Sequence, residues 1–270
     1  MLRQTWIRSL LLFGIGMLLW PAALLAQEDE NGVSVLTKPY YTKEQVEKAG
    51  GEIPPVRLEA PKDRWERLPR TAGLLGQSQG ELRVVMLGDS IINDTSQSRW
   101  DDLLQGMYPR CKITKVTCVR GSTGCWWYKE PGRVKRYVLD HHPDLLIIGG
   151  ISQRGDTESI LAVIRQVRAA SRCDVLLLSE VFGSMDPNDD KQWSFRIGPA
   201  GTDYRARLRQ LAENEKAAFF DMTAYWGKYI RESGKELKWF KRDAVHANER
   251  GMQVIGRLLA EYLAPPVGRD

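Results

Sequence analysis

Five short apolar runs, separated by longer helix-like segments, restrict the folds that this 270-residue chain can adopt. Each run is almost continuously apolar instead of alternating between apolar and polar residues. That pattern is typical of strands buried on both faces of a parallel sheet. Between the runs lie amphipathic segments with apolar residues three or four positions apart. The runs are Leu82–Leu87, Ile113–Val119, Leu145–Ile148, Val175–Leu178 and Ala217–Phe220.

This alternation predicts an α/β protein, a three-layer α/β/α sandwich with a five-stranded, mostly parallel, doubly wound sheet. The clearest helix, Thr157–Ala170, has its apolar residues on one face and follows Asp156, a residue type that caps helices. Strand twist predicts right-handed crossovers. The other expected helices are Trp100–Met107, Arg133–Leu139, Tyr204–Glu215 and a last helix from about Glu249 to Tyr262.

The first 26 residues have the features of a signal peptide. Arg3 and Arg8 precede a short apolar run, Leu10–Trp20, and Ala26 supplies a small residue at the cleavage point. The alternative is an uncleaved membrane anchor, for which the apolar run is short. We therefore expect a secreted or periplasmic protein with no stable membrane association after signal cleavage.

Two further regions follow the signal peptide. Residues 27–80 are charged and contain several prolines, and we expect an N-terminal arm that starts disordered and then packs across the main domain, residues 81–265. Within that domain, Gly183–Gly201 interrupts the alternation of strands and helices. Long loops in compact domains are usually functional or disordered, and Trp193 and Phe195 favour function here.

Charge and cysteine content narrow the class of protein. The net charge is +5, or +3 without Arg3 and Arg8 (37 basic minus 34 acidic residues), which is too small and dispersed to indicate nucleic-acid binding. Four cysteines in an oxidising compartment permit two disulfides in three pairings, whereas the alternative is four buried free thiols. A zinc site is disfavoured because there is no Cys-x-x-Cys pair. The cysteines are Cys111, Cys118, Cys125 and Cys173.

The first apolar run ends in Gly88-Asp89-Ser90, which is either a plain turn or a nucleophile at the carboxyl end of a strand. Asp243 and His246, just before the last helix, favour the second interpretation. A serine hydroxyl needs a base within hydrogen-bond reach, and the base needs a third group to orient it. His246 can be that base and Asp243 the group that orients it. His141 and His142 lie at an expected helix end and are not candidates.

From about Leu82 to Leu263 these motifs resemble those of the SGNH, or GDSL, hydrolase superfamily. The resemblance implies a flavodoxin-like fold with a catalytic triad of Ser90, Asp243 and His246. It also implies an oxyanion hole that includes the backbone N–H of Ser90. The family's second motif supplies a glycine N–H, which falls on Gly124, with Gly121 as the alternative.

The third motif departs from the family pattern of Gly-x-Asn-Asp, in which the Asn side chain donates to the oxyanion. Ile151 stands at the Asn position and cannot donate a hydrogen bond. Losing one oxyanion donor can cost a factor of about 100–1,000 in rate. Gln153 or Ser152 could replace it, Asn93 could swing in, or the site is impaired. We expect Gln153, because of its amide group.

The resemblance and the aromatic residues together indicate a substrate. Trp126 and Trp127 directly follow Gly124, and indole rings stack well on sugars. We expect both, together with Asp89, to contact substrate, whereas Trp100, Trp226 and Trp239 are expected in the core. The sequence therefore predicts a secreted serine esterase that removes acyl, probably acetyl, groups from small-molecule or polysaccharide esters.

Such an enzyme works through an acyl-enzyme and needs no metal or organic cofactor. Two alternatives remain open at this stage. A sugar hydroxyl that accepts the acyl group in place of water would make the protein an acyltransferase on glycans. The second alternative is a catalytically impaired glycan-binding protein, because Ile151 replaces the asparagine of the family's third motif.

Overall fold

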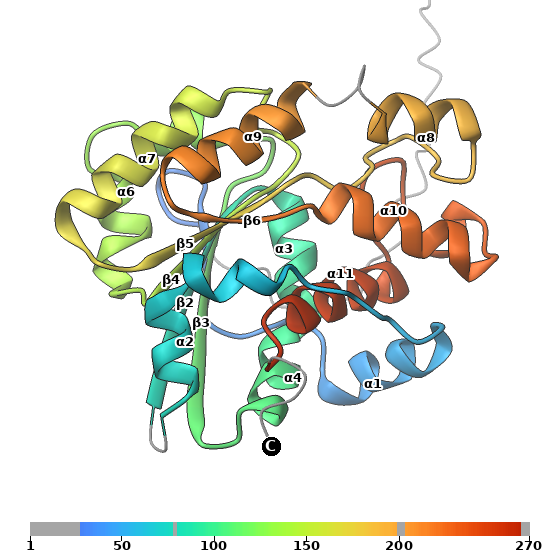
Figure 1. Ribbon diagram of the computed structural model, residues 1–270, viewed down its shortest axis with the longest axis horizontal. Coiled ribbons are helices and arrows are strands. Elements are labelled where there is room, and N and C mark those ends of the chain that lie inside the picture. The colour runs from blue at the N-terminus through green and yellow to red at the C-terminus, as the bar shows by residue number, and fades with distance from the viewer. Residues whose placement is uncertain (1–27, 78–79, 199–202, 266–270) are drawn as a thin grey trace, which may run out of the picture.

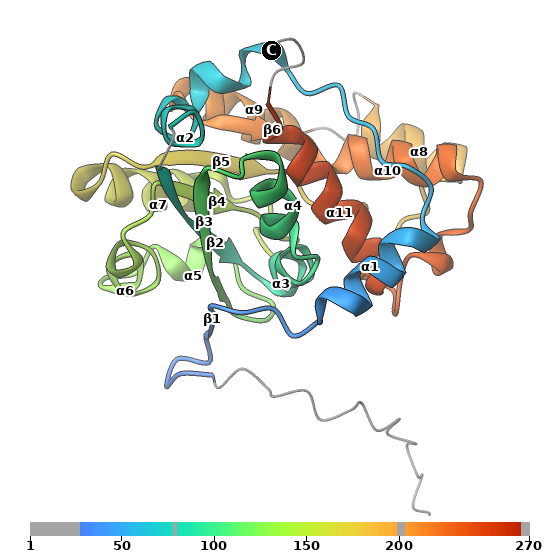
Figure 2. The same ribbon diagram turned by 90° about the horizontal axis from the view of Figure 1, so that it is seen from below.

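A computed structural model of the protein describes residues 28–77, 80–198 and 203–265. The expected signal peptide lies outside these residues. A six-stranded sheet runs in the order β1-β3-β2-β4-β5-β6. Strands β2 to β6 are labelled in Figure 1, and β1 is labelled in Figure 2. All neighbouring strands are parallel except β1, which pairs antiparallel with β3. The strands are β1 (Ser34–Leu36), β2 (Gly80–Gly88), β3 (Cys111–Val119), β4 (Leu145–Ile148), β5 (Asp174–Leu178) and β6 (Ala218–Phe220).

Helices cover both faces of the sheet, as the continuous apolar strands predicted (Figure 2). On β2, the side chains of Val84 and Met86 enter one hydrophobic core, and those of Val85 and Leu87 enter the other. One face is covered by α3 (Ser90–Gln97), α4 (Trp100–Met107), α10 (Met222–Ser233) and α11 (Glu249–Tyr262). The other is covered by α5 (Cys125–Tyr128), α6 (Arg133–Tyr137), α7 (Thr157–Ala170) and α9 (Asp203–Asn214). The predicted three-layer α/β/α sandwich is confirmed.

The N-terminal arm is more ordered than its sequence suggested. It contributes β1 to the sheet, so the sheet has six strands instead of the expected five. It also contains α1 (Lys43–Glu52), which packs against α11, and α2 (Pro69–Leu75), which packs against β2. Thr42 and Gln45 form a reciprocal capping box at the start of α1. A 3₁₀ helix (Lys62–Arg67) precedes α2.

A buried carboxylate fastens the arm to the sheet. Asp144, just before β4, accepts hydrogen bonds from Nε of Arg70 on α2 (2.9 Å) and from the backbone N–H of Arg83 on β2 (2.9 Å). Burial acts to raise the pKa of Asp144, but the hydrogen bonds from Arg83 and Arg70 outweigh it and lower that pKa. The ionised form is therefore the one that holds α2 against the sheet.

The predicted disulfides are absent, because all four cysteines are buried free thiols. Cys111 packs into the core beneath α3, α4 and α11, whereas Cys118, Cys125 and Cys173 pack into the core on the opposite face of the sheet. Burial raises the pKa of Cys118 to about 12 and that of Cys173 to about 11. These thiols behave as small apolar side chains.

The segment Gly183–Gly201, expected to be a long loop, is only partly as predicted. The long segment after β5 is not wholly a loop, because it contains α8 (Asp190–Ile197), and its last residues lie outside the described part of the chain. The described residues also include the 3₁₀ helices Leu139–His141 and Leu237–Trp239. Within the described residues, no helix is both long enough and apolar enough to cross a bilayer.

Candidate active site

Ser90 lies at a tight junction between a strand and a helix. It is the first residue of α3, and the preceding Asp89 caps that helix by accepting a hydrogen bond from the backbone N–H of Ile91 (2.9 Å). Gly88 must be a glycine, because a Cβ there would lie 2.6 Å from both the carbonyl oxygen of Gly149 and Cγ1 of Ile92. The close approach places the serine at the carboxyl edge of the sheet, where open α/β folds bind ligands.

Asp243 and His246 lie at the tip of a short antiparallel hairpin, Phe240–Asn248, which we call the His246 hairpin. The backbone N–H of Asn248 donates to the carbonyl of Phe240 (3.0 Å), and that of Arg242 donates to the carbonyl of His246 (3.1 Å). Oδ1 of Asp243 accepts hydrogen bonds from the backbone N–H groups of Val245 (2.8 Å) and His246 (2.7 Å). The aspartate therefore folds the tip as well as facing the histidine.

The structure brings Ser90, His246 and Asp243 into one hydrogen-bonded chain across 156 residues of sequence. Oγ of Ser90 lies 2.8 Å from Nε2 of His246, and Nδ1 of His246 lies 2.8 Å from Oδ2 of Asp243. Burial acts to raise the pKa of Asp243, but the hydrogen bonds from His246 and Val245 outweigh it and lower the pKa to about 2. An ionised Asp243 fixes the tautomer that leaves Nε2 free to accept the serine proton.

The sequence proposed the backbone N–H of Ser90 and that of Gly124, or of Gly121, as oxyanion donors. Among the described residues, neither the N–H of Ser90 nor that of Gly124 has an intramolecular acceptor. Gly124 is buried directly before α5, and a Cβ there would lie 2.7 Å from the carbonyl oxygen of Ser152. The alternative, Gly121, is exposed and has no atom within 4 Å of an added Cβ. The packing therefore favours Gly124.

Asp89 lies behind the site with its side chain fully buried, where the sequence had suggested a contact with substrate. Its exposed fraction is 0%, and its second oxygen accepts the backbone N–H of Ser152 (2.6 Å). Gly150, with φ of +104°, lies against the carboxylate, and a Cβ there would be 2.5 Å from Oδ1. Asp89 thus joins α3 to the loop after β4.

The residues considered as a third oxyanion donor have defined partners. The amide of Gln153 is buried; its Oε1 accepts the backbone N–H of Cys125 (2.8 Å) and its Nε2 donates to the carbonyl of Gly149 (2.9 Å). An amide nitrogen carries two N–H groups, so one remains after this bond. Oδ1 of Asn93 accepts from Gln97 (3.1 Å), one turn further along α3. Ile151 packs against the core.

The two tryptophans after Gly124 differ in their surroundings. Trp126 is partly exposed, donates from Nε1 to the carbonyl of Ser152 (3.0 Å), and has the guanidinium of Arg154 4.2 Å from its ring centre. Trp127 packs against the core, and the guanidinium of Arg133 lies 3.8 Å from its ring centre. Trp126 is therefore linked directly to the loop after β4, whereas Trp127 is mainly a packing residue.

Within the described residues, the other tryptophans named above pack in or against the core, and the other two histidines lie at a helix end. Trp100 and Trp226 are fully buried, as expected. Trp193 stacks on Phe182 with ring centres 5.7 Å apart. Trp239 packs edge-on against Phe240 with ring centres 4.8 Å apart. His141 ends a 3₁₀ helix and His142 follows it.

Sequence reasoning missed Asp94 and Arg242. The two side chains meet at 2.9 Å beneath the His246 hairpin. The available signal was an acidic residue one helical turn after the nucleophile, on the same face of the helix. Without α3 among the predicted helices, that spacing carried no information.

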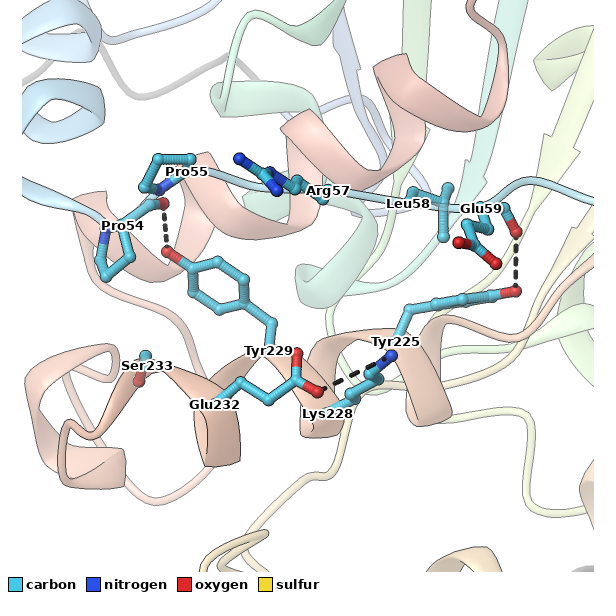
Figure 3. Close-up of a pocket in the computed structure, with 10 residues that line it drawn as sticks. All are labelled: Pro54, Pro55, Arg57, Leu58, Glu59, Tyr225, Lys228, Tyr229, Glu232 and Ser233. Atoms are coloured by element: carbon cyan, nitrogen blue, oxygen red, sulfur yellow. Dashed lines mark hydrogen bonds and ion pairs between the residues drawn. The ribbon is translucent and has the colours of Figure 1, made fainter.

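A cavity of about 670 Å³ lies between the arm and α10, and its lining residues include none of the triad (Figure 3). The extended chain from Pro54 to Glu59 spans it. Tyr229 donates to the carbonyl of Pro54 (2.6 Å) and Tyr225 to that of Glu59 (3.4 Å). The tyrosine hydroxyls therefore hold the arm against α10.

Comparison with solved structures identifies proteins with a similar fold. No family model and no curated protein matches the sequence. An acetyl xylan esterase from Geobacillus stearothermophilus has a similar structure, with a TM-score of 0.55, 16% identity, and coverage of 72% of this chain and 100% of that one. A two-domain esterase active on acetylated mannans has a TM-score of 0.55 and 16% identity, over 74% of this chain and 53% of that one.

A protein from Parabacteroides merdae described as GDSL-like has a TM-score of 0.50 and 16% identity, over 69% of this chain and 98% of that one. At such identities a structural likeness establishes the fold and not the activity. The chain therefore has the SGNH, or GDSL, hydrolase-like fold that its motifs suggested.

Proposed function

We propose that this protein is a serine esterase that hydrolyses acyl esters, with acetyl groups on carbohydrate as the preferred substrate. The observation that carries the proposal is the chain of two 2.8 Å contacts that links Asp243, His246 and Ser90. Such a chain is the arrangement that activates a serine hydroxyl at neutral pH. The fold shared with carbohydrate esterases supports it.

The reaction proceeds in two steps. Oγ of Ser90 attacks the ester carbonyl carbon while Nε2 of His246 takes the hydroxyl proton, and the resulting imidazolium gives that proton to the departing alkoxide oxygen. The acyl group then remains on Ser90. A water molecule attacks this acyl-enzyme and loses a proton to Nε2, and the imidazolium then returns that proton to Oγ of Ser90 as the carboxylic acid leaves. Asp243 stays ionised throughout and stabilises the imidazolium.

The developing oxyanion is held by backbone N–H groups of Ser90 and Gly124. Preorganised donors of this kind are among the largest contributions to acyl-transfer catalysis. We propose the second N–H of the Gln153 amide as the third donor. It would replace the asparagine side chain that the family has at the position of Ile151. Gln153 suits this role because both of its amide atoms are already fixed, to Cys125 and Gly149.

The preference for carbohydrate rests on Trp126 and on the structural neighbours. Two of the structural neighbours are an acetyl xylan esterase and an esterase active on acetylated mannans. Trp126 is tethered to the loop after β4 and flanked by Arg154, so that a partly exposed indole lies close to the proposed oxyanion donors. Its ring provides a stacking surface for a sugar.

The direct test measures hydrolysis of 4-nitrophenyl acetate and of acetylated xylan and mannan oligosaccharides. We compare wild type with Ser90→Ala and His246→Ala, and use His142→Asn, a change at an exposed histidine, as the matched control. We expect the first two variants to lose at least about 1,000-fold in kcat, since the triad acts as a unit, and the control to retain full activity.

Two results would overturn the proposal. One is a wild type that binds acetylated oligosaccharides but turns over none of these esters. The other is activity that survives in Ser90→Ala. Product analysis with added sugar acceptors separates hydrolysis from acyl transfer, because a transferase would form an acylated acceptor at the expense of free acetate.

A further inference from the structure

Helix α3 carries a second acidic side chain directly beneath the proposed nucleophile. Asp94 lies four residues after Ser90, so both occupy one face of the helix. Only 1% of Asp94 is exposed. Its Oδ2 accepts the backbone N–H of Ala247 (3.0 Å), and its Oδ1 accepts Nη2 of Arg242 (2.9 Å). One carboxylate therefore contacts both strands of the His246 hairpin.

Arg242 completes this arrangement within the hairpin. Its Nη1 donates to the carbonyl of Ala247, and its backbone N–H donates to the carbonyl of His246 (3.1 Å). Ala247 immediately follows His246, so a hydrogen bond that fixes the backbone of Ala247 also fixes the Cα of His246. The 2.8 Å contact between Ser90 and His246 is thus supported one helical turn away by a second contact between the same two elements.

We propose that Asp94 is a positioning residue, which holds the His246 hairpin against α3 and so sets the distance between base and nucleophile. This inference rests on the proposed function of the triad. Asp94 does not touch substrate, because it is buried beneath the hairpin. Catalytic groups must be held within about 0.5 Å of their productive geometry, and misplacement by about 1 Å can cost about 100-fold in rate.

The positioning depends on the charge of Asp94. Burial raises the pKa of Asp94 to about 6, with the charge and hydrogen bond of Arg242 opposing the increase only in part. The charged and titratable groups that act on it are Arg242 and His246 from the hairpin, and it acts in turn on Tyr41 from the arm. When Asp94 gains a proton, one oxygen becomes a donor and no longer suits the guanidinium. Protonation near pH 6 is therefore expected to change the hydrogen bonds that Asp94 makes with Arg242 and Ala247.

The test uses Asp94→Asn, which keeps the shape and one acceptor oxygen but removes the charge, and Asp94→Ala, which removes both. Asp102→Asn, a change at an exposed acid on α4, is the matched control. Esterase kcat and KM are measured from pH 5 to 9. In parallel, the backbone amide signals of His246 and Ala247 are followed by NMR over the same pH range, which requires no activity.

We expect kcat of both Asp94 variants to fall by about 10- to 100-fold with KM within twofold, and the control to match wild type. In wild type the Ala247 amide should titrate with a midpoint near pH 6, and in Asp94→Asn this transition should vanish. Wild-type kcat in folded Asp94 variants, or an Ala247 transition that persists in Asp94→Asn, would overturn the inference. If wild type itself proves inactive, the proposed function fails but the amide titration still decides whether Asp94 holds the hairpin.

Discussion

Replacing Gly124 with alanine tests which glycine supplies the second oxyanion donor. An added Cβ would lie 2.7 Å from the carbonyl oxygen of Ser152, 2.8 Å from Oε1 of Gln153 and 2.9 Å from Cα of Gln153. Two of these three atoms are backbone atoms, so rotating a side chain cannot relieve the contact. Since ordinary heavy-atom contacts are about 3.5–4.0 Å, the turn before α5 and the loop after β4 must separate by roughly 0.5 Å or more.

The separation moves the N–H of Gly124 away from the position of the oxyanion. Complete loss of one donor costs about 100- to 1,000-fold in kcat, or about 2.7–4 kcal/mol of transition-state stabilisation. That range is the upper limit for a displaced donor. The overpacking should also reduce the free energy of unfolding by about 1–3 kcal/mol. KM should change little, because the oxyanion forms only in the transition state and the tetrahedral intermediate.

The assay is steady-state hydrolysis of 4-nitrophenyl acetate, with circular dichroism to confirm folding. Gly121→Ala is the matched control, since an alanine Cβ there meets no atom within 4 Å. We expect Gly121→Ala to match wild type in kcat. A folded Gly124→Ala enzyme with wild-type kcat, together with a large loss in Gly121→Ala, would show that the donor had been assigned to the wrong glycine.

Two further predictions concern thiols and pH. The four buried thiols of the native protein should not react with a thiol reagent, whereas protein denatured without reductant should show four reactive thiols per chain. A count of zero or two reactive thiols in the denatured protein would instead support the disulfides. The pKa of Asp94 is raised from 3.8 to about 6 on folding, so the stability it contributes is greatest at low pH and is lost as pH rises through about 6. We expect the free energy of unfolding of wild type, measured by urea denaturation, to fall by about 2 kcal/mol between pH 4 and pH 8 relative to that of Asp94→Asn. An increase over this range would contradict the raised pKa of Asp94.

The main domain could be predicted from sequence because burial decides its elements. The five parallel strands have apolar runs that suit only the middle of a sandwich, and α7 and α11 have strong amphipathic repeats. β1 could not be found in this way. It is three residues long, and its pairing with β3 is decided by where the arm reaches the sheet. Short strands of this kind follow from tertiary contacts and leave no pattern in the sequence.

At the site, spacing predicted the residues that meet but not the ones that hold them in place. Gly-Asp-Ser and Asp-x-x-His indicated Ser90, Asp243 and His246, which lie within hydrogen-bond distance. The same motif suggested that Asp89 contacts substrate, whereas it is buried beneath the loop after β4. The sequence does not distinguish a buried carboxylate from an exposed one in this case. The partners of Asp89 are backbone N–H groups, which nearly every residue has, so no partner side chain marks the burial.

The two buried carboxylates on either side of Ser90 suggest why one short helix can organise the whole site. Asp89 holds the backbone of Ser152, and with it the loop that packs on Gly124, while Asp94 holds the backbone of Ala247 in the His246 hairpin. Both are charge-assisted contacts to main-chain donors, which are stronger than neutral hydrogen bonds. The proposed oxyanion donors and the proposed base are therefore each held in position relative to α3, the helix that begins with the proposed nucleophile. A change that shifts α3 should displace all three together, whereas a change at Asp94 should disturb the base and leave the oxyanion donors in place.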